Sequence, residues 1–548
     1  MIKKVIMYSL LLSLLTVTAC SQSTNVPQQQ TNTPNKESSS NTKTTTQTLK
    51  INAKTEPPSL NPALIDNQSA GDIANQLFEG LARVDKNGEI LPGVAEKWDV
   101  SDDKTVYTFH LRQDAKWSNG EPVTAEDFVY SWEKALRPDT GAPLADNLSF
   151  IKNGSKYLAG EIKDPTTLGI MAINPQTLQV TLERPTPFFL RLTSFFSVLP
   201  INKKLDESNP NWSGEAPSFV SNGPFMMKEW KHDQEIVMVP NPHYWAKNSV
   251  KLQSIEWKMV NDQNTEYQMY QTGELDIAYP PTSATAKLLT EGKAKTVPVA
   301  RTAYVRYNHK DSLFANQKIR KAFASAIDRK MLVDKVVQGG QTPATALIPE
   351  GLSSGNGDFR TQAGTDQFTG YSVEEAKKLL EEGLKELNQA SLPTVTFLTD
   401  NNDLRSKISQ ALQEMWKRNL GVEVEIKSME RKVFVQSVKA GEFQFALYST
   451  GADYDDSYNL FGQFTTGDGY NYSKYSNPEY DKFVKAAFQE TDPAKRAQAM
   501  IEAEKVLMND MAINPLYYDK LVILENERVK NVYRFAVSAL DLREAFVE

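Results

Sequence analysis

The composition of residues 1–47 sets them apart from the rest of the chain. We expect these residues to form a leader outside the fold, and residues 48–548 to form the body that folds. Lys3 and Lys4 precede an apolar run from Val5 to Val17, and Cys20 follows the run closely. A basic start, an apolar stretch and small residues, in this order, are typical of a secretory signal. The run is too short for a permanent membrane-spanning helix, which needs about 20 residues. The body is therefore predicted to fold outside the cytoplasm.

Cys20 is the only cysteine of the chain and follows Val17-Thr18-Ala19. This ending resembles the bacterial lipobox, whose cysteine is diacylated and becomes the new N-terminus. The resemblance implies a signal peptide over residues 1–20 and a lipid anchor at Cys20; an incidental cysteine in an ordinary signal peptide is the alternative. A diacylglyceryl unit with further acylation buries enough CH₂ groups for stable membrane attachment.

Residues 21–47 consist mainly of Ser, Thr, Gln and Asn, with almost no apolar side chains. Such a segment buries too little surface to offset its conformational entropy. We expect a disordered tether that holds the body away from the membrane. The predicted location is the extracytoplasmic face of the cell membrane, on a Gram-positive cell surface, with the lipid as the sole membrane attachment.

Composition excludes several classes of function. A body without cysteine has no disulfide, no thiolate metal site and no cysteine nucleophile. The chain has 4 histidines, none in a metal-site spacing, and it lacks both the Gly-x-Ser-x-Gly and the phosphate-loop motifs. A net charge of −7 without a basic run argues against nucleic acid. We expect a protein that is not an enzyme and that holds no metal or cofactor.

Hydrophobic patterns and helix caps predict a mixed α/β body. Apolar residues alternate with polar ones at Tyr107-Phe109-Leu111, Leu178-Val180-Leu182 and Val422-Val424-Ile426, which indicates strands. Beyond about residue 390, strands alternate with helices, a pattern that favours parallel pairing. Helix starts are predicted at Thr124 with Asp127, at Ser372 with Glu375, at Asn477-Pro478 and at Asp492-Pro493, with a helix end at Gly383.

A series of short motifs occurs in a fixed order over the body. The motifs include Pro92–Trp98, Tyr107–Arg112, Trp117–Phe128, Val220–Phe225, Gly273–Asp276 and Ala326–Arg329. With them, the body resembles the oligopeptide-binding group of the peptide/nickel-type solute-binding family, the lipoproteins and periplasmic proteins that serve peptide ABC importers. Much of this signature is expected to be structural, with Trp98, Trp117 and Phe128 in the core.

The resemblance implies an α/β fold of the periplasmic-binding-protein type, a two-lobed clamp with an additional inserted domain. The first domain would comprise residues 48–78, 203–303 and 522–548. The second, inserted domain would be residues 79–202, and the third residues 304–521. The ligand would lie between the first and third domains, and crossover segments near Ala303 and Leu521 would carry the hinge rotation.

The function implied by the resemblance is that of a monomeric extracytoplasmic receptor, which binds oligopeptides between two lobes and delivers them to the permease subunits of an ABC importer. One alternative keeps the fold but narrows the ligand to a signalling or cell-wall peptide. A secreted hydrolase is a further alternative, against which the missing catalytic motifs argue. Nickel, sugar or dipeptide ligands remain possible within the family.

A peptide of free sequence always offers an ammonium, a carboxylate and a row of backbone groups. The segment Gly451–Asp456 matches the family segment whose aspartate holds the ammonium, which assigns that role to Asp453. A local capping role is the alternative, for which Asp455 and Asp456 compete. Ser449, Thr450 and Gly451 would lie along the peptide and give backbone hydrogen bonds, as in strand addition.

Other candidate ligand contacts are also carried over from the family. Asp66, Asn67 and Gln68 would face the peptide from the opposite wall, and Asn471 would line the same cleft. Thr450 and Arg431 stand where some relatives have tryptophan, Arg405 where some have histidine, and Leu447 where some have arginine. Arg405 or Arg431 could meet the ligand carboxylate through its bidentate fork, and a solvated surface arginine is the alternative for each.

Overall fold

The protein is described by a computed structural model for residues 46–364, 370–537 and 540–548, which belong to one structural unit, Thr45–Glu548. The predicted signal peptide, Cys20 and the tether up to residue 45 lie outside the described residues.

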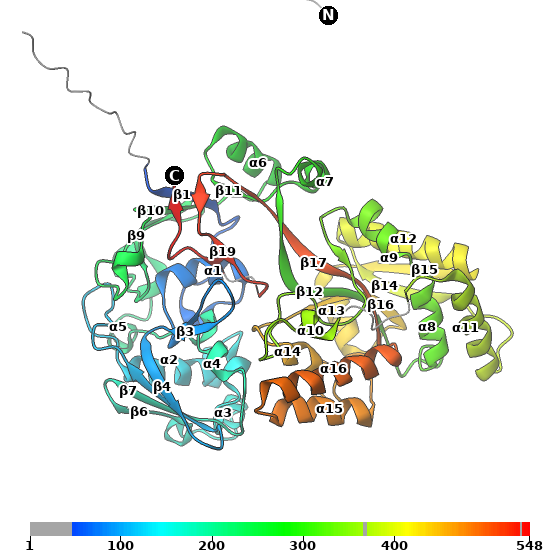
Figure 1. Ribbon diagram of the computed structural model, residues 1–548, viewed down its shortest axis with the longest axis horizontal. Coiled ribbons are helices and arrows are strands. Elements are labelled where there is room, and N and C mark those ends of the chain that lie inside the picture. The colour runs from blue at the N-terminus through cyan, green and yellow to red at the C-terminus, as the bar shows by residue number, and fades with distance from the viewer. Residues whose placement is uncertain (1–45, 365–369, 538–539) are drawn as a thin grey trace, which may run out of the picture. The chain divides into compact units, whose positions relative to one another are not determined.

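A large mixed sheet runs through this unit (Figure 1). Its strand order is β15-β14-β16-β12-β17-β11-β1-β10-β9-β8, with β13 paired to β17. The strands are β1 (Thr48–Asn52), β8 (Phe225–Lys231), β9 (Glu235–Pro240), β10 (Ser254–Lys258), β11 (Ile277–Ala278), β12 (Lys295–Tyr307), β13 (Thr342–Pro343), β14 (Val395–Asp400), β15 (Val424–Met429), β16 (Phe445–Gly451) and β17 (Ile513–Glu525).

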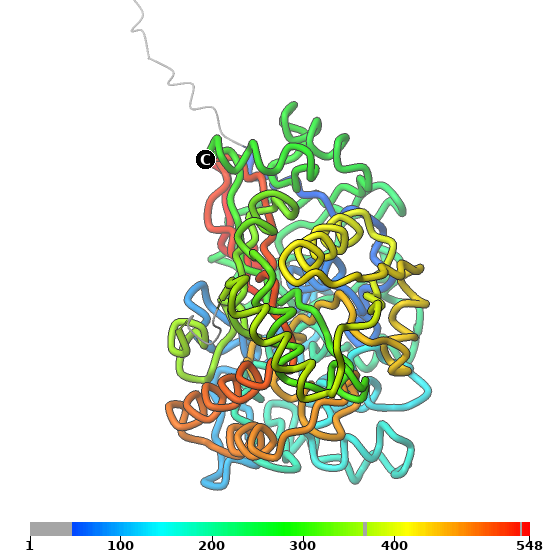
Figure 2. The backbone as a smooth tube through the Cα atoms, turned by 90° about the vertical axis from the view of Figure 1, so that its right-hand side faces the viewer, coloured from blue at the N-terminus to red at the C-terminus, as the bar shows by residue number. Residues whose placement is uncertain are grey.

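The long strands β12 and β17 join the two halves of this sheet, and they lie side by side in both views (Figures 1 and 2). They are antiparallel, and their register shifts between Pro298 and Thr302. Ala303 pairs with Tyr517, and Leu521 pairs with Val297, so both expected crossover positions lie within this strand pair.

The predicted parallel pairing beyond residue 390 is confirmed. Strand β14 is parallel to β15 along its whole length and to β16 at Phe397 and Leu398. The strand expected at Val422–Ile426 begins two residues later, because β15 runs from Val424 to Met429. Helices α12 (Asp403–Leu420) and α13 (Arg431–Ala440) connect these strands. The α/β fold class predicted from the sequence is therefore confirmed.

An antiparallel sheet of order β4-β5-β7-β6 lies within residues 79–202. Its strands are β4 (Ala95–Val100), β5 (Val106–Leu111), β6 (Ile170–Asn174) and β7 (Thr177–Thr181). Strand β5 buries Tyr107, Phe109 and Leu111, as its alternation predicts. Helix α2 (Ala125–Leu136) begins with the predicted capping box of Thr124 and Asp127. Trp117 and Phe128 are fully buried, whereas Trp98 is only half-buried.

The remaining elements are short strand pairs and helices. The strand pairs are β2 (Ala82–Val84) with β3 (Ile90–Pro92), β18 (Val529–Lys530) with β21 (Phe546–Val547), and β19 (Tyr533–Arg534) with β20 (Leu540–Asp541). The helices are α1 (Gln68–Leu77), α3 (Gly154–Leu158), α4 (Phe189–Leu192), α5 (Lys203–Ser208), α6 (Gln263–Thr272), α7 (Thr282–Thr290), α8 (Gln317–Ser325), α9 (Arg329–Leu332), α10 (Phe359–Ala363), α11 (Val373–Glu386), α14 (Tyr458–Gly462), α15 (Pro478–Gln489) and α16 (Pro493–Asn509).

The predicted helix starts at Ser372, Asn477 and Asp492 are confirmed, since each side chain caps its helix. The predicted helix end at Gly383 is wrong, because α11 continues to Glu386. A Cβ atom at position 383 would lie 2.7 Å from Ile319 Cδ1 of α8. This glycine therefore allows two helices to approach closely.

Candidate functional site

The edge of β16 is open where the sequence predicts backbone contacts with a ligand. On one side, β16 pairs with β12 from Phe445 to Gly451. On the other side, its pairing with β14 ends at Ala446. Among the described residues, the stretch from Leu447 to Gly451 therefore has no strand partner on that side. An unpaired strand edge can accept a further extended chain.

The backbone groups that face this open edge follow from the ladder. The N–H of Ala452 donates to Ala300 O of β12, at 2.8 Å. Because successive residues of a strand point to opposite sides, Thr450 also faces β12, whereas Ser449 and Gly451 face the open edge. The Thr450 hydroxyl is paired with Gln463 Oε1 at 2.7 Å. Of the three predicted contact residues, Ser449 and Gly451 therefore offer backbone groups.

Asp453 follows this strand and is an exposed residue. Its backbone N–H donates to Asn459 Oδ1 of α14 at 3.0 Å. Within the described residues, no lysine, arginine or histidine nitrogen lies within 4.0 Å of its carboxylate. Partial loss of solvent raises the pKa of Asp453, and repulsion from Asp146 adds to this rise, while the Asn459 side chain opposes it. The site therefore has an unneutralised negative charge.

Asp453 and two other acidic groups, Asp146 and Asp468, act on the hydroxyl group of Tyr470. The pKa of the Tyr470 hydroxyl is raised by burial and by the negative charges of Asp146, Asp453 and Asp468. Tyr470 is 56% exposed, so its ring is accessible beside these carboxylates. A cluster of anions with an aromatic surface suits a cationic group on a ligand.

The two neighbouring aspartates, by contrast, have cationic partners. Arg496 binds Asp456 with two hydrogen bonds, of 2.7 and 2.9 Å, and both residues are buried. Asp455 accepts hydrogen bonds from Arg191 Nη1 at 2.7 Å and from the Ser353 N–H at 2.9 Å. Of the three aspartates in this segment, only Asp453 has a carboxylate without a cationic partner among the described residues.

Arg405 and Arg431 share one carboxylate, that of Asp400 at the end of β14. Arg431 Nη1 lies 2.7 Å and Arg405 Nε 3.4 Å from Asp400 Oδ2. Arg405 also donates to Leu447 O and to Ser449 Oγ, and its side chain is 17% exposed. The Arg431 side chain is 54% exposed. The sequence did not indicate Asp400, whose importance follows only from this shared pairing.

Asp66, Asn67 and Gln68 form the start of α1. Asn67 caps the helix by accepting from the Ala70 N–H at 3.0 Å, and it donates to Asp66 Oδ1 at 2.7 Å. Gln68 donates to Asp72 Oδ1 at 2.9 Å. Asp66 is exposed, and the other two are half-buried. These side chains are therefore engaged locally, with Asp66 the most accessible.

Asn471 is a structural support of the loop before α15. Asn471 is 3% exposed, and its side-chain amide donates to the backbone oxygens of Thr465 and Tyr475, at 2.9 and 2.8 Å. Its Oδ1 accepts from the Tyr475 N–H at 3.2 Å. Any effect of Asn471 on a ligand would therefore act through the shape of this loop.

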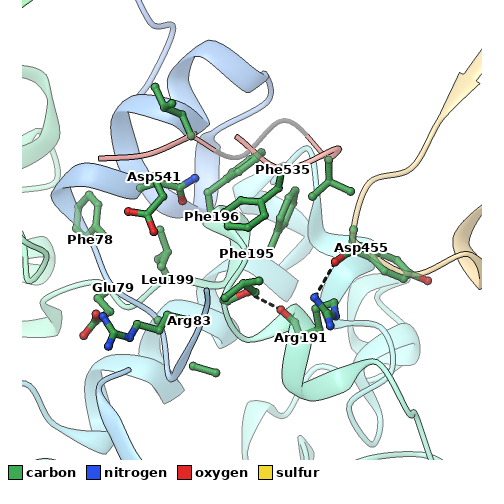
Figure 3. A pocket seen from close by; sticks show the side chains of 18 of the residues that line it. Phe78, Glu79, Arg83, Arg191, Phe195, Phe196, Leu199, Asp455, Phe535 and Asp541 are labelled. Carbon is green, nitrogen blue, oxygen red and sulfur yellow. Dashed lines mark hydrogen bonds and ion pairs between the residues drawn. The ribbon is translucent and has the colours of Figure 1, made fainter. Parts of the chain in front are cut away.

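A cavity of about 90 Å³ lies next to the Asp453 segment (Figure 3). Its lining includes Phe195 and Arg191 from residues 79–202, Asp455 from the segment after β16, and Phe535 and Asp541 near the C-terminus.

No helix in residues 46–364, 370–537 and 540–548 is long and apolar enough to cross a membrane. The same residues contain no group of three or more His, Cys, Asp and Glu side chains arranged to hold a metal ion.

Known proteins similar to this chain match almost all of its length. The family model for bacterial extracellular solute-binding proteins, family 5 Middle, matches residues 89–472. The dipeptide-binding protein DppE of Bacillus subtilis is 40% identical over 500 residues, 91% of this chain and 92% of that protein.

Solved structures of peptide-binding proteins extend the similarity to the fold and confirm the two-lobed clamp predicted from the sequence. The OppA protein of Listeria monocytogenes bound to peptide is 35% identical, with a TM-score of 0.72 over 92% of this chain and 99% of its own. The unliganded open form of the murein tripeptide-binding protein MppA is 31% identical, with a TM-score of 0.80 over 92% and 98%.

Proposed function

Because this chain belongs to the bacterial extracellular solute-binding proteins of family 5, we propose that it is a receptor that binds oligopeptides and delivers them to the permease of an ABC importer. The names of its relatives support this function, since they bind dipeptides, murein tripeptides or other peptides. The observation that carries the proposal is the uncompensated carboxylate of Asp453 beside the open edge of β16. A peptide can match both features with its ammonium and its backbone.

In this proposal, the ligand lies between a first domain (48–78, 203–303, 522–548) and a third domain (304–521), with residues 79–202 inserted. The paired strands β12 and β17 carry the rotation that closes the lobes on the ligand. Arg431 is the better candidate for the ligand carboxylate, because it is more exposed than Arg405 and has fewer partners. Asp66 faces the ligand from the other wall.

The alternative of a receptor for one signalling or cell-wall peptide differs in its ligand spectrum. A panel of unrelated short peptides, each with free, N-acetylated and C-amidated forms, separates the two by calorimetry. A transport receptor should bind many of the free peptides with similar affinity, because backbone and terminal contacts do not depend on sequence. Strong binding of a single peptide would favour the narrower function.

A hydrolase is the remaining alternative. The relatives named above are binding proteins, and we propose that this chain also releases its ligand unchanged. Incubation with a bound peptide, followed by mass spectrometry, should recover the intact peptide. Turnover into fragments would contradict the receptor function.

Peptide binding should weaken as the pH falls. This weakening should begin at a higher pH than it would if Asp453 had the pKa of an ordinary aspartate. The pKa of Asp453 is raised above the usual 3.8, and only the ionised carboxylate pairs with an ammonium. Protonation of the free protein therefore competes with the ligand, so the affinity is complete above the raised pKa and is lost as the pH falls through it. Calorimetry between about pH 7 and pH 4 measures this loss. The Asp453→Asn variant should lack it, and equal pH dependence in both proteins would contradict the assignment.

The lipid anchor at Cys20 is proposed as the membrane attachment of the receptor. The Cys20→Ala variant should leave the membrane fraction and appear in the soluble fraction, because the anchor rather than the body holds it. The body should remain folded, as judged by an unchanged melting temperature. Full retention of the variant in the membrane fraction would contradict a lipid anchor at this residue.

A further inference from the structure

A compact contact joins the segment after β16 to residues 79–202. The proposed function does not by itself require residues 79–202 for binding. The rings of Phe188 and Tyr454 are stacked, with centroids 4.7 Å apart and planes at 18°. Arg191 Nη1 donates to Asp455 Oδ2 at 2.7 Å, and the two side chains point toward one another (Figure 3). We call these four residues the clasp.

The clasp is well shielded from solvent. Phe188 and Tyr454 are 3% and 6% exposed, and they form a hydrophobic cluster with Leu192 and Phe488. The side chains of Arg191 and Asp455 are 16% and 19% exposed. An ion pair in this setting is screened less by salt than a pair on the open surface.

Arg191 is fixed on its own side of the contact. It lies in α4, and its Nη2 donates to Gly88 O, in the turn between β2 and β3, at 2.7 Å. The guanidinium therefore bridges the β2–β3 turn and Asp455. Asp455 is held in turn by the Ser353 N–H. The position of this segment is thus determined jointly by both parts of the chain.

Two of the clasp residues, Tyr454 and Asp455, directly follow Asp453 in the sequence. Tyr454, Asp455 and Asp456 each have a partner that fixes the side chain, whereas the carboxylate of Asp453 has no cationic partner among the described residues. Because neighbouring residues share a backbone, the partners of Tyr454 and Asp455 restrict the backbone from which the Asp453 side chain extends. We propose that Phe188 and Arg191 are positioning residues for Asp453, so the inserted domain takes part in recognising the ligand's N-terminus.

This inference rests on the proposed function, and its main competitor is a direct charge effect. If the charges acted only at a distance, loss of Arg191 would strengthen the binding of an ammonium, and loss of Asp455 would weaken it. Positioning predicts the same sign for both, because either change opens the clasp. The two single variants, Arg191→Gln and Asp455→Asn, therefore separate the explanations.

The test measures the affinity of one peptide in free and N-acetylated form by calorimetry. We expect Arg191→Gln and Asp455→Asn each to lower the affinity for the free peptide by about tenfold. The ratio of the affinity for the free peptide to the affinity for the N-acetylated peptide should also fall. A general loss of stability would lower both affinities and leave this ratio unchanged. The double variant should bind no worse than either single variant, because both remove one interaction.

The matched control is Arg137→Gln, which removes an exposed arginine paired with Asp139 in the same inserted domain. It should leave the affinity ratio unchanged. A stronger affinity in Arg191→Gln, or an unchanged ratio in both clasp variants, would overturn the positioning role while leaving the receptor function intact. Equal binding of free and acetylated peptide by the wild type would overturn the role of Asp453 and the positioning role together.

Discussion

The Asp453→Asn variant should bind free oligopeptides at least two orders of magnitude more weakly than the wild type. Once the lobes close on the ligand, the ammonium and the carboxylate are both removed from water. Loss of one charge then leaves the other buried and unpaired, which costs about 3–5 kcal/mol. Each 1.4 kcal/mol is about tenfold in affinity. Titration calorimetry with a single defined peptide measures the difference.

N-acetylation of the peptide should have nearly the same effect on the wild type. The two losses should not add, because they delete one interaction from opposite sides. Asp102→Asn is a matched control, since it makes the same chemical change at an exposed position within residues 79–202. It should bind as the wild type does. Tight binding of acetylated peptides to the wild type would show that Asp453 does not hold the N-terminus.

Arg496→Leu should lower the free energy of unfolding by about 3–5 kcal/mol, because it leaves the buried Asp456 carboxylate without its cation. Arg496 and Asp456 are 1% and 2% exposed. Arg496 also donates to Ser354 O at 2.9 Å and to Ala487 O at 3.1 Å, so the change removes further hydrogen bonds. Thermal and denaturant unfolding measure this loss.

The exposed pair of Arg137 and Asp139 offers the comparison for this effect. Its side chains are 42% and 76% exposed, and such surface pairs contribute about 0–1 kcal/mol. Arg137→Leu should therefore change the stability little. The double variant Arg496→Leu/Asp456→Leu should be more stable than Arg496→Leu alone, because no buried charge then lacks a partner. A stability loss in Arg496→Leu no larger than in Arg137→Leu would contradict this account of the segment.

Local features of the fold could be predicted because their signals lie within a few residues of one another. The capping box of Thr124 and Asp127 and the alternation in β5 both appear as expected. Gly383 misled the prediction, because a glycine also permits close helix packing, and its neighbour Ile319 is distant in sequence. The same limit applies to β12 and β17, whose pairing joins segments about two hundred residues apart.

The candidate site was predicted by family resemblance, and the contacts that organise it were not. The partnership of Arg191 and Asp455 spans 264 positions, and no local pattern links the two residues. Arg405 and Arg431 could be identified from the sequence as basic candidates. Only the structure shows that they share the Asp400 carboxylate and that the Arg431 side chain is the more exposed of the two. The sequence also does not show that Ser449 and Gly451 direct their backbone groups to the open edge, because this follows from the register of β16 with β12.

Mass spectrometry of the ligand released from the protein as purified from cells tests the central claim most directly. A peptide receptor whose site holds an ammonium and backbone groups should release a mixture of short, unmodified peptides with free amino termini. The same peptides, added back, should bind to the wild type and not to Asp453→Asn. Recovery of only non-peptide ligands, together with no detectable binding of free peptides, would contradict the account.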